Sequence, residues 1–235
     1  MLILALESSA KAASAALARD GALLDMAFRN DGLTHSCTLL PMAEEVLARC
    51  GLSLSDLDAV AVARGPGSFT GIRIGVSTAK GLCWGADKPA VGVSTLEAMA
   101  WNAVGAAPAD SLVCCAMDAR RNQVYNALFT IADGAPRRLT PDRAVGLPEL
   151  AQELADTEKT IFVLGDGGAL CYNYLIERSL PAALASEDVR LQNAWGVCRA
   201  AEGKTPAPAG ELLPTYLRLS QAERERLERM KKETN

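Results

Sequence analysis

Two carboxylates stand at the ends of apolar runs that are typical of strands, and both could take part in chemistry. Glu7 closes "LILALE" beside Ser8 and Ser9, and Asp118 closes "LVCCAMD". Carboxylates at facing strand ends hold Mg²⁺ through water, while the N–H groups of glycine turns bind phosphates. One hypothesis is therefore a vestigial nucleotide site; its members would be Glu7, Ser8, Ser9, Asp118, Gly165 and Gly167. The alternative is that the two acids are solvated or cap turns.

A glycine-rich loop lies between an apolar strand and an expected helix, in the stretch "ARGPGSFTGIRIG" at 63–75. A strand, a glycine loop and a helix N-terminus together commonly bind phosphate. A Walker A loop needs Lys and Ser or Thr after its last glycine, but Gly71 is followed by Ile72 and Arg73. The dinucleotide fingerprint needs a sixth-position glycine, and Thr70 stands there. The loop therefore fails both strict nucleotide-binding patterns.

The helix expected after this loop is apolar around most of its circumference. From 71 to 85 its only charges are Arg73 and Lys80, which form one narrow stripe with Ser77. Such a helix must be covered on more than one side, either by its own chain or by a partner subunit. The pattern alone leaves both alternatives open. In the second, the partner-binding surface would lie on this helix and on its neighbour over 36–50; its members would be Gly71, Ile72, Ile74, Gly75, Val76, Ala79, Leu39, Met42 and Val46.

The single histidine limits the catalytic chemistry of the chain. A metal site built from a histidine pair cannot form within it, and a Ser-His-Asp triad would have to use His35 at a helix start. We expect His35 to cap a helix or lie on the surface, and we assign no catalytic or metal-binding residue. Seven cysteines without a C-x-x-C pair indicate reduced thiols. The adjacent pair Cys114 and Cys115 should point to opposite faces of a strand.

The elements that must position these residues occur in a repeated order. An apolar strand ends in a carboxylate, and an Asp-Gly hairpin turn follows, first at 20–21 and again at 133–134. Two such units about 110 residues apart indicate a duplicated lobe. We predict a first lobe over 1–105, a reduced second lobe over 106–220 and a charged helical tail over 221–235. Strands are expected at 2–6, 12–18, 22–28, 59–63, 90–93, 112–117, 124–131 and 161–164. Helices are expected at 36–50, from the glycine-rich loop to about 85, from 94 onward, and at 169–178.

Composition narrows the class of protein further. A chain of 235 residues suffices for one large domain or two small lobes. Its formal net charge of −4 disfavours binding of nucleic acid through its own field. We find neither a signal peptide nor a run long enough to cross a membrane, and we expect a cytoplasmic protein without a membrane partner.

Five stretches together carry a resemblance to a known family. "LALESS", "HSCTLLP", "ARGPGSFTGIRIG", "MDARRNQVY" and "YLRLSQAERE" occur in the order and spacing of the TsaB (YeaZ) family, and the resemblance covers essentially the whole chain. It implies an α/β fold of the actin/Hsp70/sugar-kinase type, with two ribonuclease-H-like lobes of which the second is reduced. Many relatives have Asp-Thr-Ser where this chain has Glu7-Ser8-Ser9, which makes an ATP–Mg²⁺ site more doubtful.

The resemblance also implies a function. It predicts a non-catalytic subunit for threonylcarbamoylation of the adenosine next to the tRNA anticodon. Such a subunit dimerises with the transferase TsaD, or with itself when alone, through first-lobe helices. The ATPase TsaE joins the assembly, and tRNA is bound only through the complex. TsaD-like proteins carry a metal-binding histidine pair, whereas the matching region here has His35 alone, followed by Ser36-Cys37-Thr38.

Two other functions remain as alternatives. The first is an actin-like, ATP-dependent small-molecule phosphotransferase that uses Glu7, Asp118 and the glycine turns. No cofactor is required under the main hypothesis, and ATP or ADP with Mg²⁺ would bind weakly at a composite interface. The second is a metallopeptidase, which the single histidine disfavours.

Overall fold

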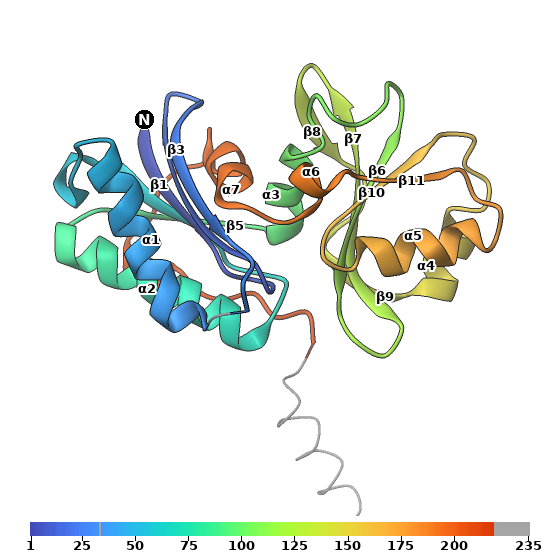
Figure 1. The fold of residues 1–235 in the computed structure, drawn as a ribbon, viewed down its shortest axis with the longest axis horizontal. Coiled ribbons are helices and arrows are strands. Elements are labelled where there is room, and N and C mark those ends of the chain that lie inside the picture. Colours follow the sequence, from blue (N-terminus) through green and yellow to red (C-terminus); the bar gives the residue numbers. More distant parts are fainter. Residues whose placement is uncertain (33, 219–235) are drawn as a thin grey trace, which may run out of the picture.

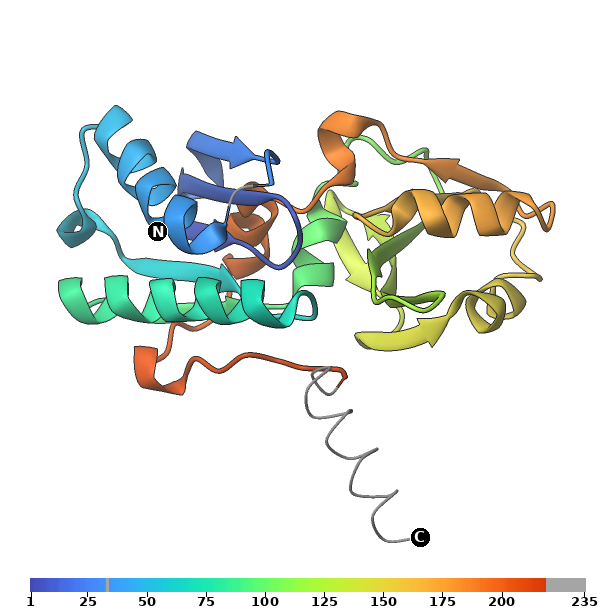
Figure 2. The same cartoon turned by 60° about the horizontal axis from the view of Figure 1, so that its bottom comes forward.

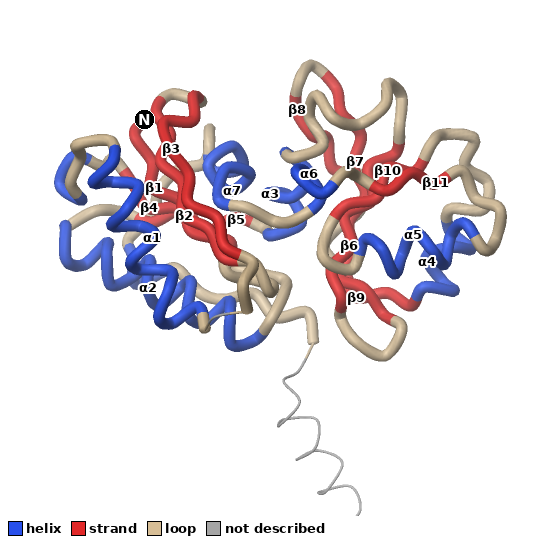
Figure 3. The backbone as a smooth tube through the Cα atoms, viewed as in Figure 1, coloured by secondary structure: helices blue, strands red, loops and turns tan. Residues whose placement is uncertain are grey.

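Short, largely apolar strands build the first of two sheets (Figures 1 and 3). The computed structural model describes residues 1–32 and 34–218, so the predicted tail over 221–235 lies outside the described residues. The expected Asp20-Gly21 turn is confirmed, because both residues have the positive φ of a tight hairpin. The sheet order is β3-β2-β1-β4-β5, in which β1 is antiparallel to β2 and parallel to β4. The strands are β1 (Leu2–Glu7), β2 (Ala13–Arg19), β3 (Ala22–Arg29), β4 (Ala59–Ala63) and β5 (Ala90–Val93).

Helices cover both faces of the first sheet, and for this reason every residue of β1 is buried. One face packs against α1 (His35–Arg49) and α2 (Phe69–Ala86), with the short helix η1 (Leu54–Asp56) between α1 and β4 in the chain. The other face packs against α7 (Ala194–Ala201), which in turn packs against α3 (Thr95–Trp101). A central strand buried on both faces needs a continuous apolar sequence, as the run in β1 provides.

The second lobe repeats the first. Its sheet runs β8-β7-β6-β10-β11, the same order of antiparallel and parallel neighbours as in the first sheet, with β9 added beside β7. This topology confirms the predicted duplication. The helices of this lobe are short, with 7, 9 and 4 residues. The elements are β6 (Leu112–Asp118), β7 (Gln123–Ala132), β8 (Ala135–Arg138), β9 (Arg143–Gly146), α4 (Leu147–Glu153), β10 (Ile161–Leu164), α5 (Gly168–Ile176), β11 (Ala182–Leu184) and α6 (Glu187–Arg190).

Two separate cores cover the faces of the second sheet. Cys114 belongs to the core beneath α4 and α5, and Cys115 belongs to the core that faces α3. The two thiols therefore point to opposite faces of β6, as predicted from their adjacency.

The chain returns to the first lobe before it ends, which corrects the predicted second lobe over 106–220. Helix α7 packs on β1, β2 and β4, and Ala207 pairs with Ala90 at the edge of the first sheet. The helix η2 (Ala209–Glu211) then packs beside α2. The sequence of α7 could not show that this helix packs on the first lobe, because its alanine-rich apolar face could be buried against either lobe.

Local signals set the bounds of α2. The Ser68 hydroxyl accepts a hydrogen bond from the Gly71 N–H at 3.3 Å, which caps the first turn. The helix ends where Asp87 adopts a left-handed conformation and its N–H donates to Cys83 O. Ser94 likewise caps α3 by accepting from Glu97 N at 3.1 Å, at the start of the helix expected from 94. Within the described ranges, no helix has the length and apolar character that crossing a membrane requires.

Candidate functional site

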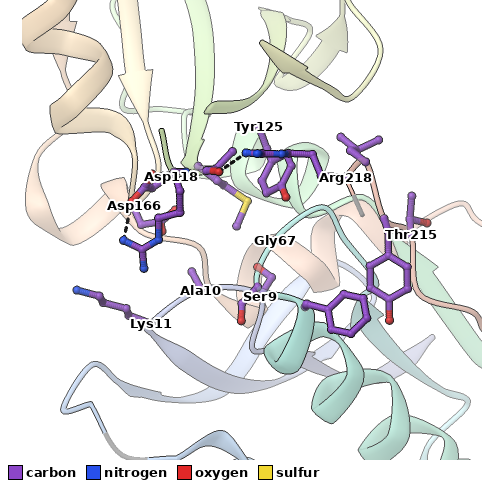
Figure 4. Close-up of a pocket in the computed structure, with 16 residues that line it drawn as sticks. Ser9, Ala10, Lys11, Gly67, Asp118, Tyr125, Asp166, Thr215 and Arg218 are labelled. Carbon is purple, nitrogen blue, oxygen red and sulfur yellow. Dashed lines mark hydrogen bonds and ion pairs between the residues drawn. The ribbon is translucent and has the colours of Figure 1, made fainter. Parts of the chain in front are cut away.

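A cleft of about 410 Å³ lies between the two lobes, at the ends of β1 and β6 and the start of α2 (Figure 4). Of the six residues predicted for a nucleotide site, only Ser9 and Asp118 line it. The lining also includes charged and aromatic side chains that the sequence did not single out for this site. The full lining is Ser9, Ala10, Lys11, Gly67, Ser68, Phe69, Met117, Asp118, Ala119, Arg120, Tyr125, Asp166, Thr215, Tyr216, Leu217 and Arg218.

Glu7 lies behind the cleft wall and is fully buried at the end of β1. Its Oε1 accepts a hydrogen bond from the Ser9 N–H at 2.6 Å, while Oε2 has no hydrogen-bond partner among the described residues. Burial raises the pKa of Glu7 from its ordinary value of 4.5 to about 7, and contacts with Ser9 oppose that rise only in part. Glu7 therefore cannot offer a solvated carboxylate to a ligand in the cleft.

Ser8 has a packing role. Its hydroxyl donates to Gly71 O at 2.9 Å and is fully buried. A Cβ on Gly75 would lie 2.5 Å from Ser8 Oγ, and a Cβ on Gly71 would lie 2.1 Å from Ser8 O. These glycines bring α2 against the end of β1, which accounts for two of the glycines in the stretch that first suggested a phosphate loop.

Asp118 and Asp166 are the carboxylates that line the cleft. Asp118 accepts from the Arg120 N–H at 2.7 Å and forms an ion pair with the Arg120 guanidinium at 3.2 Å. Asp166 accepts from Gln192 Nε2 at 2.9 Å. The Asp166 side chain is exposed at the cleft mouth. Its partial burial raises its pKa above the ordinary value, and the nearby Asp118 carboxylate adds to the rise. Lys11, Arg120 and Arg218 bring positive charge to the same cleft.

Gly165 and Gly167 do not line the cleft, because they pack against the backbone of β6. A Cβ on Gly165 would lie 2.0 Å from Ala116 O, and one on Gly167 would lie 2.6 Å from Asp118 N. Both positions need glycine for close approach of two backbones. The predicted phosphate-binding turn is thus a structural turn in the described residues.

The residues present do not fit a magnesium–nucleotide site. Glu7 is sealed behind the wall, Asp118 is paired with Arg120, and the "GDGG" turn faces β6. Among the described residues, no group of three or more His, Cys, Asp or Glu side chains is arranged to hold a metal ion. His35, the one histidine, has its Nε2 at 2.6 Å from Ala10 O and so links the start of α1 to the cleft loop.

The predicted partner-binding residues are nearly all buried within this chain, which corrects their assignment as contact residues. Eight of the nine belong to the buried class, and Ile74 alone is half-buried. They face the core that α1, α2 and the first sheet share, and η2 packs along another side of α2. A segment distant in sequence thus supplies part of the cover that we attributed to a partner. The buried residues are Gly71, Ile72, Gly75, Val76, Ala79, Leu39, Met42 and Val46.

A different face of α2 remains open. Ser77, Gly81 and Gly85 are exposed at spacings of four residues, and Trp84 beside them is 66% exposed. Within the part of the chain that the structure describes, a Cβ on Gly81 or Gly85 would meet no atom within 4 Å. The sequence signal for this face was the small-residue spacing itself. Apolar residues at the other positions of the helix dominate its pattern and obscure this signal.

Two sheets of the same strand order, duplicated along the chain in two lobes with a cleft between them, define the actin/Hsp70/sugar-kinase-like class of fold. YeaZ from Pseudomonas aeruginosa has a similar structure, with a TM-score of 0.75 and 30% identity over 92% of this chain and 99% of that one. The chain belongs to the TsaB (YeaZ) family.

Sequence comparisons establish this membership. The chain is 31% identical to the tRNA threonylcarbamoyladenosine biosynthesis protein TsaB of Bacillus subtilis, over 98% of this chain and 100% of the relative. It is 35% identical to the TsaB of Haemophilus influenzae, over 93% and 94% of the two chains. Residues 32–156 match the family model of TsaD, the tRNA N6-adenosine threonylcarbamoyltransferase.

Proposed function

We propose that this chain is a non-catalytic subunit for threonylcarbamoylation of the adenosine next to the tRNA anticodon, and that it binds a TsaD-like transferase through the open face of α2. Relatives named for threonylcarbamoyladenosine biosynthesis match over nearly the full length and support the pathway. The match of residues 32–156 to the TsaD family model supports a partner built on a related fold. The observation that carries the docking face is the pair of open glycines, Gly81 and Gly85.

The glycine pair is unfavourable for the isolated chain. A glycine inside an exposed helix costs about 1 kcal/mol relative to alanine. Neither Gly81 nor Gly85 is needed for packing, because the space beyond each Cα is empty among the described residues. Small residues four apart let a second helix pack closely, with the two helix axes near the lower limit of the usual ~8–10 Å separation. A partner helix on this face supplies the physical reason for both glycines.

Trp84 is suited to the edge of the same interface. Tryptophan is enriched among residues that contribute most to binding energy, and a ring that is 66% exposed is available to a partner. Lys80 Nζ lies 5.8 Å from the ring centroid, and Arg73 is exposed one turn from the start of the helix. An apolar strip of small residues with a tryptophan and two cations beside it matches the core-and-rim pattern of specific interfaces.

The remaining partners follow from this assignment as parts of the same proposal. The open face of α2 also serves a homodimer when the transferase is absent, so the two assemblies exclude each other. A TsaE-like ATPase joins the heterodimer, and tRNA is held through the complex, in line with the net charge of −4. The chain itself is not the catalyst, a proposal supported by its single histidine, which contacts Ala10 O.

The test uses Gly81→Leu and the cognate TsaD-like transferase. Leucine fits the open space and is a better helix former than glycine, so the free chain should unfold at the same or a higher temperature. We expect at least about a tenfold weaker affinity for the transferase by calorimetry, which corresponds to about 1.4 kcal/mol. Asn173→Leu, on the exposed face of α5, is the matched control and should bind normally. Unchanged affinity of Gly81→Leu would refute the docking face.

The rival proposal, an actin-like phosphotransferase, has weaker support because Glu7 is sealed and Asp118 is paired. Calorimetric titration with ATP and Mg²⁺ separates the two proposals. A working kinase should bind ATP in the micromolar to millimolar range. We propose that the isolated chain requires no nucleotide and that any ATP or ADP is bound only weakly at a composite interface with its partner.

A further inference from the structure

Three motifs that lie far apart in the sequence meet at the mouth of the inter-lobe cleft. They are the glycine loop at 63–75, the turn of "MDARRN" after β6, and the segment Leu212–Arg218, which we call the C-terminal strap. After η2 the strap runs beneath α2 toward the gap between the lobes (Figure 2). Four of its residues, Thr215 to Arg218, line the cleft.

The strap is fixed to the first lobe at its start. Leu212 is buried in the core beneath α2, and the Thr215 N–H donates to Arg64 O at 2.7 Å. Gly65 has a φ of +124°, and a Cβ on it would lie 2.2 Å from Thr215 O. The loop therefore needs glycine at 65 both for its backbone conformation and for the close approach of the strap.

Tyr216 provides a second anchor. Its ring stacks on Phe69 with centroids 4.6 Å apart, and Arg73 Nε donates to the Tyr216 hydroxyl at 2.9 Å. The Arg73 guanidinium also lies 3.9 Å from the centroid of the Phe69 ring. Because the ring stack, the cation over the ring and the hydrogen bond act on the same few residues, this contact holds the strap firmly against the start of α2.

Arg218 then crosses to the second lobe. Its Nη1 donates to Ala119 O in the turn that follows β6 (Figure 4). Arg120, Arg121 and Asn122 in this turn all have positive φ, a left-handed conformation that asparagine tolerates but that is unfavourable for the two arginines. Such strain persists where the surroundings fix it, and it often marks a functional position.

The back of the cleft is closed by different contacts. Helix α3 packs both on α7 of the first lobe and on β6 and β8 of the second. Asn102 Nδ2 donates to Leu191 O at 2.9 Å, and Ser94 Oγ donates to Asp142 at 2.6 Å. Figure 1 shows α3 between the lobes on one side and the end of the strap on the other. This is the arrangement of a hinge with a fastening opposite to it.

We propose that the C-terminal strap is a clasp that sets the angle between the two lobes. Tyr216 anchors it to the first lobe, and Arg218 fastens it to the strained turn of the second. Release of Arg218 opens the cleft about α3, while the strap stays anchored through Thr215 and Tyr216. This inference concerns the chain alone and does not rest on the proposed function.

Spin–spin distances test the clasp directly. Labels on Glu44→Cys of α1 and Glu149→Cys of α4 report the separation of the lobes from exposed helix positions away from the strap. Cys37 and Cys50, the two thiols outside the buried class, are replaced by Ser in the background. We expect one narrow distance distribution for the clasped protein. Arg218→Ala should lose the narrow distribution and gain longer distances.

Matched variants distinguish the clasp from a general loss of structure. Lys80→Ala removes a hydrogen bond within the first lobe, from α2 to Gly210 O of η2 just before the strap, and should leave the narrow distribution unchanged. Tyr216→Phe keeps the ring stack and should also stay narrow, whereas Tyr216→Ala should broaden it. Circular dichroism confirms that each variant is folded. An unchanged distribution in folded Arg218→Ala would overturn the proposal, and so would broadening in Lys80→Ala.

Discussion

Glu7→Gln is the substitution whose effect can be derived most fully from the structure. The folded protein keeps a proton on Glu7 up to about pH 7, whereas the unfolded chain releases it near 4.5. Between these values the folded state binds more protons, so stability must fall as the pH rises through this window. The rise in pKa from 4.5 to about 7 corresponds to roughly 3 kcal/mol of lost stability above pH 7.

Glutamine imitates the protonated acid and removes this dependence. The carbonyl of the introduced glutamine can still accept from Ser9 N, and its amide is neutral at every pH. At pH 5 the two proteins should have similar stability, and at pH 8 Glu7→Gln should be more stable than the parent, by up to about 3 kcal/mol.

Urea unfolding between pH 5 and 8 provides the assay. As the pH rises, Glu7→Gln should become increasingly more stable than the parent, measured as the difference in unfolding free energy. Glu149→Gln, which changes an exposed carboxylate of α4, controls for the loss of a surface charge. Parallel stability curves for Glu7→Gln and the parent would refute the reasoning, because they would mean that Glu7 ionises in the folded protein without penalty.

Three further predictions concern the packing of α1 and α2. Gly71→Ala should destabilise the chain by about 1–3 kcal/mol in urea unfolding, because its Cβ would lie 2.1 Å from Ser8 O; a smaller loss would mean that the helix shifts freely. Ser68→Ala should lower stability by about 1 kcal/mol through loss of the N-cap, measured likewise. Leu39→Ala should lower the free energy of unfolding by about 2–5 kcal/mol. Because Leu39 is fully buried and cannot touch a partner, the folded fraction should still bind the transferase normally. Weakened binding by that fraction would restore Leu39 as a contact residue.

Much of the fold could be predicted because its signals are local. The Asp-Gly turns, the cap at Ser94 and the strands of the two hairpins each depend on neighbouring residues, and each is present. The repeated order of strand, acid and turn indicated the duplication, which the two sheets confirm. The pairing of β9 with β7 and the return of α7 to the first lobe depend on distant contacts, and no local pattern contained them.

The candidate site was harder to predict for the same reason. Which face of α2 is covered depends on α1 and η2, and η2 follows more than a hundred residues later. An apolar pattern shows that a residue needs cover without showing whether its own chain supplies it. The carboxylate of Glu7 gave a similar difficulty, since its place at a strand end was correctly recognised but its complete burial was not. The open glycines at 81 and 85 were the readable signal of the remaining face.

A photo-crosslinking residue placed at Ser77 tests most directly whether this face binds the transferase. Ser77 is exposed one turn before Gly81, and the same crosslinker at Asn173 of α5 controls for random encounters. We predict that the Ser77 position crosslinks to the TsaD-like transferase in the assembled complex and that the Asn173 position does not. Equal crosslinking at both positions, or crosslinking at Asn173 alone, would contradict a partner seated on the open face of α2.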